Sequence, residues 1–310
     1  MRVLVTGATG FVGRALTRRA GELGWEVSRG IRGQGHLNER ADDKVVSLDP
    51  ATGHFELDAP VDAVLHLAAI AHAHGVDPGS YRSANAIWPQ KLAMRAAALG
   101  IAHFLFVSTA KVVGDALDRP ADETEPLRPA DPYAASKAEA ESLLAGVARQ
   151  TGLRITVIRP PLVYGPGVGA NFLQLLRIVD AGWPLPFASV TNRRSLIYVG
   201  NLMSAIEASL ERPAERTRTF FVSDDHDVST PELVTAVAAA LGRQPRLFAF
   251  PPRLVAAAGR LLGQGDRIAR LLDSLQVDIS HIKTELGWRP PYSLEQGLAE
   301  TALWYRTRRQ

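Results

Sequence analysis

The segment Arg2-Val3-Leu4-Val5-Thr6-Gly7-Ala8-Thr9-Gly10-Phe11-Val12-Gly13 decides the fold of this 310-residue chain. A run of strand length leads directly into three glycines, each three residues apart, and residues 11–23 then follow a helical pattern. Gly7 allows a sharp turn, Gly10 lets backbone N–H groups approach a pyrophosphate, and Gly13 lets the helix pack against the strand. Because the glycines stand between a strand and a helix, the segment predicts a dinucleotide-binding turn rather than a glycine-rich loop without a ligand.

Strands and helices alternate from this segment to about residue 160, which predicts an α/β fold with a doubly wound parallel sheet of the Rossmann type. Strands are expected at 26–32, 44–48, 63–69, 104–107 and 155–158, and helices at 85–99 and 133–149. Past residue 167, helices and prolines dominate, with strands expected only at 195–199 and 219–222. We therefore expect a dinucleotide-binding domain at 1–165 and a smaller, mostly helical substrate lobe at 166–310, with some strands returning to the sheet.

Composition excludes several classes of function. The net charge of +3, with no block of five basic residues, argues against nucleic acid as a partner. The chain has no cysteine, and its eight histidines lack metal-ligand spacing, so we expect no disulfide, thiolate nucleophile or metal site. No apolar run reaches about 18 residues, so no membrane span is expected. A strand that begins at residue 2 leaves no room for a signal peptide, and we expect a cytoplasmic protein.

The second expected strand bears on the choice of dinucleotide. Folds that bind NAD place a carboxylate near the end of this strand, where it holds the ribose 2′-hydroxyl. Here that place falls on Ile31, with Arg29 and Arg32 on either side. An arginine suits a 2′-phosphate, so the sequence favours NADP(H), with NAD(H) as the alternative. In a plainer interpretation, Arg32 stacks on the adenine or faces solvent.

Two chemical features lie further along the chain. Tyr133 and Lys137 stand four residues apart on an expected helix, which places them on one face. A nearby ammonium would lower the pKa of the phenol, so that Tyr133 could exchange a proton near neutral pH. Alone this pair is weak evidence, because such spacing is common on surface helices. His66, inside an apolar run, is interpreted as a hydrogen-bonded core residue rather than a catalytic one.

Ser108-Thr109-Ala110 follows an apolar strand, at the edge where doubly wound sheets bind ligands. The order of glycine turn, Ser-Thr-Ala segment and Tyr-Lys helix closely resembles the extended short-chain dehydrogenase/reductases over most of the chain. Within that family the chain is most similar to the nucleotide-sugar 4-epimerases and 4-keto-sugar reductases. The resemblance also covers His66-Leu67-Ala68-Ala69, Asn85, residues 106–114 and residues 159–166.

The resemblance implies roles for individual residues. The catalytic group would be Thr109, which holds the sugar oxygen, Tyr133, which moves its proton, and Lys137. The cofactor would contact Gly7, Thr9, Gly10, Phe11, Val12, Arg32, Leu67, Ala68, Ala69, Asn85, Tyr133, Lys137 and Pro160. The nucleotide sugar would contact Ser108, Lys111, Asn171 and Arg194. Alternatively, Asn171 caps a helix and Arg194 is a surface arginine beside Arg193. The family also implies a homodimer through the helices at 85–99 and 133–149.

The chain departs from the epimerase pattern at three places. Epimerases of this family usually carry Tyr at Val113, an acid near Ile31 and Asp at Ser195. These departures favour an NADP(H)-dependent reductase of a nucleotide-linked, UDP-type 4-keto-deoxyhexose in polysaccharide sugar biosynthesis. The alternative is a UDP-hexose 4-epimerase with tightly bound NAD. A steroid or flavonoid ketone substrate and a non-catalytic dinucleotide-sensing regulator are the more distant alternatives. Residues 254–272 are expected to be mostly helical, and to pack in the second lobe rather than lie on a membrane.

Overall fold

The computed structural model describes residues 1–32, 44–71, 76–212 and 217–308. Within them, seven parallel strands form the central sheet in the order β3-β2-β1-β4-β5-β6-β9. The strands are β1 (Arg2–Thr6), β2 (Glu26–Arg32), β3 (Lys44–Leu48), β4 (Ala63–His66), β5 (His103–Val107), β6 (Arg154–Arg159) and β9 (Arg218–Phe221). This order reverses direction at β1, as expected for a doubly wound sheet, and confirms the predicted fold class.

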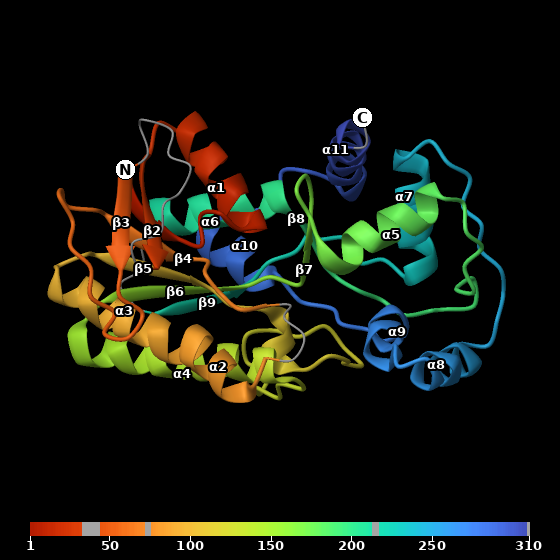
Figure 1. Cartoon of the computed structure of the whole chain (residues 1–310), viewed down its shortest axis with the longest axis horizontal. Helices are drawn as coiled ribbons and strands as arrows, with labels where there is room; N and C mark the ends of the chain where they lie inside the picture. The colour runs from red at the N-terminus through yellow and green to blue at the C-terminus, as the bar shows by residue number, and fades with distance from the viewer. Residues whose placement is uncertain (33–43, 72–75, 213–216, 309–310) are drawn as a thin grey trace.

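Helices cover both faces of the sheet (Figure 1). One face carries α1 (Phe11–Glu22) and α6 (Val199–Glu211), and the other carries α3 (Trp88–Ala98) and α4 (Pro132–Thr151). In β1, Val3 and Val5 join the core cluster on the α1 side, whereas Leu4 joins the cluster on the α3–α4 side. Because successive strand side chains point to opposite faces and both faces are covered, the strands read as continuous apolar runs.

The second lobe lies to the right of the sheet in Figure 1 and is mostly helical. A short parallel pair, β7 (Leu162–Tyr164) and β8 (Leu196–Tyr198), stands between it and the sheet. The remaining helices are α2 (Pro78–Arg82), α5 (Ala170–Asp180), α7 (Thr230–Ala240), α8 (Pro252–Leu261), α9 (Gly265–Leu272), α10 (Ser280–Leu286) and α11 (Leu294–Thr307), with a π-turn at Ser83–Ile87 and a 3₁₀ turn at Ala110–Val113. None of the helices in the described ranges is long and apolar enough to cross a bilayer.

Some element boundaries differ from those predicted from the sequence. The apolar run 63–69 is a strand only to His66, and its small residues form the loop that follows. The strand predicted at 195–199 ends at Tyr198 because helix α6 begins at Val199. The helical stretch 254–272 is interrupted at Gly263, whose φ of 66° ends α8 and separates it from α9. β9 forms one edge of the central sheet, although it follows the second-lobe helix α5 in sequence. The domain boundary at residue 165 stays a prediction.

The glycine turn has the geometry that its spacing predicts. Gly7 has a φ of 76°, and a Cβ on it would lie 2.6 Å from the backbone nitrogen of Ala68. A Cβ on Gly13 would lie 2.1 Å from the carbonyl oxygen of Gly7. The turn can therefore close only with glycine at both places, because the backbones of β1, α1 and the loop after β4 are in contact here.

Gly13→Ala tests this close packing. The added methyl group meets backbone atoms rather than a movable side chain, so we expect a loss of about 2–3 kcal/mol of unfolding free energy, together with loss of dinucleotide binding. Gly21→Ala is the matched control in the same helix, since nothing lies within 4 Å of its Cβ position. The control should be stabilised by about 0.5–1 kcal/mol. Equal urea midpoints for the two variants would contradict the packing argument.

Candidate active site

The N-terminus of α1 is open to a phosphate group. Gly10 is the N-cap residue with extended backbone, and no side chain accepts a hydrogen bond from the first turn of the helix. Thr9 and Gly10 are exposed, and Phe11 and Val12 of the first turn are partly exposed. Free backbone N–H groups and the helix dipole together favour an anion here. The turn therefore fits the pyrophosphate of a dinucleotide in the way that the sequence predicts.

The loop after β4 forms the wall next to this turn. Leu67 donates its backbone N–H to the carbonyl of Thr6, and Ala68 touches Gly7. Ala68 is partly exposed and Ala69 is exposed, so small side chains line the predicted cofactor path. The loop thus brings Leu67, Ala68 and Ala69 beside the glycine turn.

Asn85 is buried and makes a full set of contacts inside the protein. Its side-chain oxygen accepts from the backbone of Ile70 (2.9 Å), and its amide donates to the carbonyl of Ile70 (3.0 Å) and to the hydroxyl of Ser136 (3.0 Å). Ser136 in turn donates to the carbonyl of Tyr133 (2.7 Å). Both amide hydrogens are used inside the protein, and the predicted contact of Asn85 with the cofactor stays a prediction. Asn85 ties the loop after β4 to the start of α4.

Lys137 points from α4 back to the end of β5. Its ammonium donates to the carbonyl of Val107 (2.7 Å) and lies 4.2 Å from the centre of the Phe106 ring. Burial lowers the pKa of Lys137 to about 7, while the carboxylate of Glu141 opposes this shift. The side chain is therefore only partly charged at neutral pH.

Tyr133 lies in the first turn of α4, next to Thr109 at the end of β5. Burial and the negative charge of Asp131 raise the pKa of the Tyr133 phenol, whereas a hydrogen bond with the Thr109 side chain acts in the opposite direction. The prediction that Lys137 lowers this pKa is wrong here, because the ammonium is directed at Val107 and Phe106 and is itself desolvated. The Thr109 side chain therefore lies close enough to the phenol to act on its pKa, and the catalytic roles of the two residues stay predictions.

An ion pair fixes the position of Tyr133 relative to Thr109. Asp131 caps α4 by accepting from the backbone N–H of Ala134 (2.7 Å), and its other oxygen accepts from the Lys111 ammonium. The backbone N–H of Lys111 donates to the Thr109 hydroxyl (3.3 Å). Burial alone would raise the pKa of Asp131, but its bonds to Lys111 and Ala134 lower it overall. Lys111, predicted to bind substrate, is thus engaged by Asp131 and by Asp115 (3.2 Å).

Ser108 presents a buried hydroxyl without a partner in the described structure. Its backbone N–H donates to Ile158 (2.7 Å), but its Oγ has no hydrogen bond. Next to it, the backbone N–H of Ala110 donates to the carbonyl of Pro160 (2.8 Å), which joins the ends of β5 and β6. Buried hydroxyls are rarely left unpaired, so Ser108 has hydrogen-bonding capacity for a ligand at this edge of the sheet.

Arg194 is a partly buried arginine of the second lobe, not a surface residue. It donates from Nη1 to the carbonyl of Asp273 (2.9 Å), and burial lowers its pKa while the charges of Asp115 and Asp273 raise it. Arg270 of α9 lies close enough to act on the pKa of both Arg194 and Asp131. Arg270 is therefore an electrostatic neighbour of both Arg194 and Asp131, and sequence analysis identified only Arg194.

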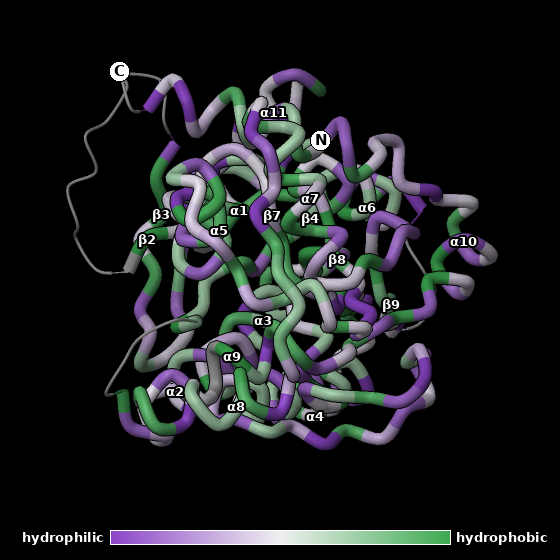
Figure 2. The backbone as a smooth tube through the Cα atoms, turned by 90° about the vertical axis from the view of Figure 1, so that its right-hand side faces the viewer, coloured by the Kyte–Doolittle hydropathy of each residue, from purple (hydrophilic) through white to green (hydrophobic). Residues whose placement is uncertain are grey.

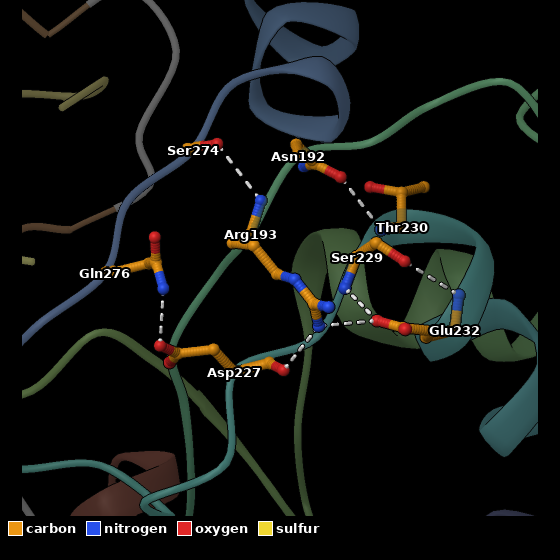
Figure 3. Close-up of polar contacts among 8 residues, drawn as sticks. All are labelled: Asn192, Arg193, Asp227, Ser229, Thr230, Glu232, Ser274 and Gln276. Atoms are coloured by element: carbon orange, nitrogen blue, oxygen red, sulfur yellow. Dashed lines mark hydrogen bonds and ion pairs between the residues drawn. The ribbon is translucent and has the colours of Figure 1, made fainter. Parts of the chain in front are cut away.

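The backbone that carries Arg194 is fixed by a polar network (Figure 3). Arg193 points away from the site to the capping box of α7, where it contacts Glu232 (3.0 Å) and the carbonyl of Asp227 (3.2 Å). The Ser195 hydroxyl donates to the side chain of Asp227, at its Oδ1 (2.5 Å). A carboxylate from another segment of the chain therefore lies beside Ser195.

Asn171 is exposed in the first turn of α5. The helix is capped by Gly169, and no side chain caps it, so the interpretation of Asn171 as a cap is wrong. Its predicted contact with substrate stays a prediction. The side chain of Arg32 lies outside the described residues, as do His72 and His74, so the 2′-phosphate hypothesis is not tested there.

His66 is a core residue, as predicted. Its Nδ1 hydrogen-bonds the Thr6 hydroxyl (2.8 Å), and the rings of Phe106 and Trp88 surround it at 5.8 and 5.1 Å. Burial, followed by the charge of Lys137, lowers the pKa of His66 well below its usual value. The imidazole is therefore neutral at physiological pH and supports the packing between β1, β4 and β5.

Comparison with known proteins connects this geometry to a family. A model of the NAD dependent epimerase/dehydratase family matches residues 3–222. The chain is 36% identical over 314 residues to the UDP-glucose 4-epimerase of Vibrio cholerae, which covers 97% of this chain and 94% of that protein. The chain belongs to this family.

Further relatives agree with the assignment. The N-acetyl-alpha-D-glucosaminyl-diphospho-ditrans,octacis-undecaprenol 4-epimerase of Escherichia coli O157:H7 is 26% identical over 96% of this chain and 93% of that protein. The solved structure of Thermus thermophilus UDP-glucose 4-epimerase in complex with NAD has a TM-score of 0.76 and 26% identity, and the alignment covers 99% of each chain. The family is described as NAD-dependent, and its members similar to this chain include enzymes named for UDP-glucose and dTDP-glucose, which confirms the resemblance predicted from the sequence.

Two residues near the candidate site were missed from the sequence, Asp131 and Arg270. Asp131 stands before Pro132 at the start of α4, and this Asp-Pro pair is a helix-start signal that could have identified it as the cap. Its ion pair with Lys111 could not be foreseen. Arg270 has no such signal, because arginines on a short amphipathic helix usually face solvent.

The lowered pKa of Lys137 predicts a dependence of stability on pH. Between pH 7 and 9 the unfolded chain keeps this lysine protonated, whereas the folded protein increasingly does not, so unfolding free energy should rise with pH. In urea unfolding, we expect the free energy of unfolding to rise with pH more steeply in the wild type than in Lys137→Met, by up to ~1.4 kcal/mol per pH unit. Lys44→Met, at an exposed lysine, should leave the slope unchanged. Parallel curves for wild type and Lys137→Met would contradict the burial of this amine.

Proposed function

We propose that the protein is a UDP-hexose 4-epimerase. The observation that carries the proposal is the 36% identity, over 97% of the chain, to a UDP-glucose 4-epimerase, and the position of Thr109 beside the Tyr133 phenol supports it. Three departures in the sequence favoured a 4-keto-sugar reductase. The comparisons support the alternative interpretation, a UDP-hexose 4-epimerase, better. The third departure, Ser195 in place of Asp, is weaker evidence against an epimerase, because the carboxylate of Asp227 lies beside Ser195.

The residues at the carboxyl edge of the sheet would have different roles in the reaction. Thr109 and Tyr133 would hold the oxygen on C4 of the sugar, and Tyr133 would take the hydroxyl proton and later return it. When bound, the nicotinamide would accept the hydride from C4, give it back, and in its oxidised state favour the phenolate by its positive charge. The hydride must return to the opposite face of C4, so the protein has to hold the nucleotide firmly and the sugar loosely.

Arg194 and Arg270 suit the firm part of this binding. A guanidinium pairs with phosphate oxygens through two parallel N–H donors and stays charged at neutral pH. Both residues lie on the second lobe, and Arg270 is close enough to act on the pKa of Arg194 and of Asp131. We assign them the diphosphate of the nucleotide sugar, with the sugar directed at Tyr133.

A 4-keto-sugar reductase remains the second candidate, favoured by one observation in the structure. The raised pKa of Tyr133 keeps the phenol protonated, which is the state that donates a proton to a ketone oxygen. The two functions differ in stoichiometry. An epimerase interconverts two sugars without consuming reductant, whereas a reductase oxidises one NAD(P)H for each sugar.

The choice between NAD and NADP rests on the end of β2. The family is NAD-dependent. The described part of β2 carries Arg29 and no carboxylate at Ile31, which still favours NADP(H) as a prediction. Identification of the dinucleotide released from purified protein on denaturation would decide it. The homodimer through α3 and α4 also stays a prediction.

Tyr133→Phe tests the proposed reaction. Without the phenolic oxygen the proton on the C4 oxygen has no acceptor, so kcat for UDP-glucose and UDP-galactose interconversion should fall by roughly a hundredfold to ten-thousandfold. Dinucleotide binding should persist. The assay contains no added reductant, so turnover by the wild type also separates epimerase from reductase. Tyr292→Phe, at an exposed tyrosine, is the control. Retention of full activity by the Tyr133 variant would remove the proposal.

Arg194→Gln tests the diphosphate assignment against its neighbour. Loss of a charge-assisted contact worth about 1.5–3 kcal/mol should raise KM for the nucleotide sugar by roughly ten- to a hundredfold, with a smaller change in kcat. Arg193→Gln should leave KM near the wild-type value, because Arg193 faces the cap of α7. Equal KM values for the two variants would place the diphosphate elsewhere.

A further inference from the structure

The segment between α7 and α9 has an unusual charge pattern. From Gly242 to Gly265 the sequence contains four arginines and no aspartate or glutamate. Arg243 is paired with Asp180 (3.0 Å). Arg246, Arg253 and Arg260 are exposed and form no ion pair within the described residues. The surface over this segment is therefore positively charged, with no carboxylate of its own to offset the charge.

Helix α8, in the middle of this segment, has one buried side. Val255 and Gly259, four residues apart, face α9, and a Cβ on Gly259 would lie 2.7 Å from Ile268. This contact joins α8 to a small apolar cluster of the second lobe that includes Phe187 and Val190. The packing predicted for this stretch is thus present, and it accounts for only one side of the helix.

The outer side of α8 exposes large apolar side chains. Leu254 is 54% exposed, Leu261 is 89% exposed, and Leu262, directly after the helix, is 75% exposed. Leu254 and Leu261 are seven residues apart and so lie on one face of the helix. Arg253 and Arg260 have the same spacing and follow one edge of this face. The exposed surface, hereafter the α8 outer face, consists of Leu254, Leu261 and Leu262 with Arg253 and Arg260.

The α8 outer face lies at a corner of the molecule. Figure 1 places α8 at the outer end of the second lobe, with α9 on its inner side. Figure 2 looks onto this lobe and shows green hydrophobic stretches interrupted by purple residues in the α8–α9 region. The chain that enters α8 adds the exposed rings of Phe248 and Phe250.

The positive charge of Arg253 and Arg260 indicates which kind of partner fits this face. A second copy of the chain, paired through the same face, would bring Arg253 and Arg260 against their own counterparts, and like charges oppose that contact. An anionic lipid surface instead supplies negative charge over the arginines and an apolar layer a few ångströms below it for the leucines. Helices that lie in a membrane interface combine a short apolar face with flanking arginines in this way.

We propose that the α8 outer face docks on the surface of an anionic phospholipid bilayer. Arg253 and Arg260 would meet the headgroups, and Leu261 and Leu262 would enter the boundary of the acyl region. The proposal concerns binding alone and does not rest on the proposed reaction.

Vesicle sedimentation with the full chain tests the docking. The wild type should sediment with mixed phosphatidylcholine–phosphatidylglycerol vesicles and stay in solution with pure phosphatidylcholine. Since each arginine near an anionic surface contributes about fivefold to partitioning, Arg253→Gln with Arg260→Gln should lower it about 25-fold and remove most of its salt dependence. Leu261→Ser with Leu262→Ser should lower it at least tenfold.

Leu303→Ser is the matched control, because Leu303 is 57% exposed on α11, outside this face. It should leave partitioning unchanged, and circular dichroism should show all variants folded. Equal sedimentation with neutral and anionic vesicles, or equal loss in the Leu303 variant, would overturn the proposal. A change in oligomeric state on light scattering in the Leu261/Leu262 variant would also overturn it, because the face would then be a contact between copies.

Discussion

The structure depends on a contact among three backbones at the end of β1. Gly7 lies against Ala68, and Gly13 of α1 lies against the carbonyl of Gly7, at distances that leave no room for a Cβ. This contact brings the first helix onto the sheet and aims its uncapped N-terminus at the carboxyl edge. The site on that edge is therefore built around a constraint of backbone packing, and phosphate binding follows from the same geometry.

The chemistry of the site comes from how α4 is attached to the strands beside it. Asp131 caps the helix and is held by Lys111, so the first turn, with Tyr133, stays beside Thr109. Asn85 binds the same turn from the other side, through Ser136. Polar contacts thus fix the backbone position of Tyr133, whose phenol has to exchange a proton.

Burial determines the protonation of the two titrating groups on α4. Removal from water raises the pKa of Tyr133 and lowers that of Lys137, so both groups move toward their neutral forms at physiological pH. The spacing of Tyr133 and Lys137 in the sequence predicted that they share one helix, which is correct. It could not predict their electrostatics, because Lys137 is directed at the carbonyl of Val107, thirty residues away in the sequence.

The sequence by itself determined the glycine turn, the alternation of strands and helices and the Ser108–Thr109 site at the end of β5, because each depends on spacing within a few residues. Only the tertiary structure decided that Arg270 is an electrostatic neighbour of Asp131 and Arg194, that Ser195 bonds Asp227 and that Leu254 and Leu261 of α8 are exposed. These contacts join segments that are far apart in the chain. Their side chains have no local pattern to distinguish them from ordinary surface residues, so packing alone reveals their neighbours.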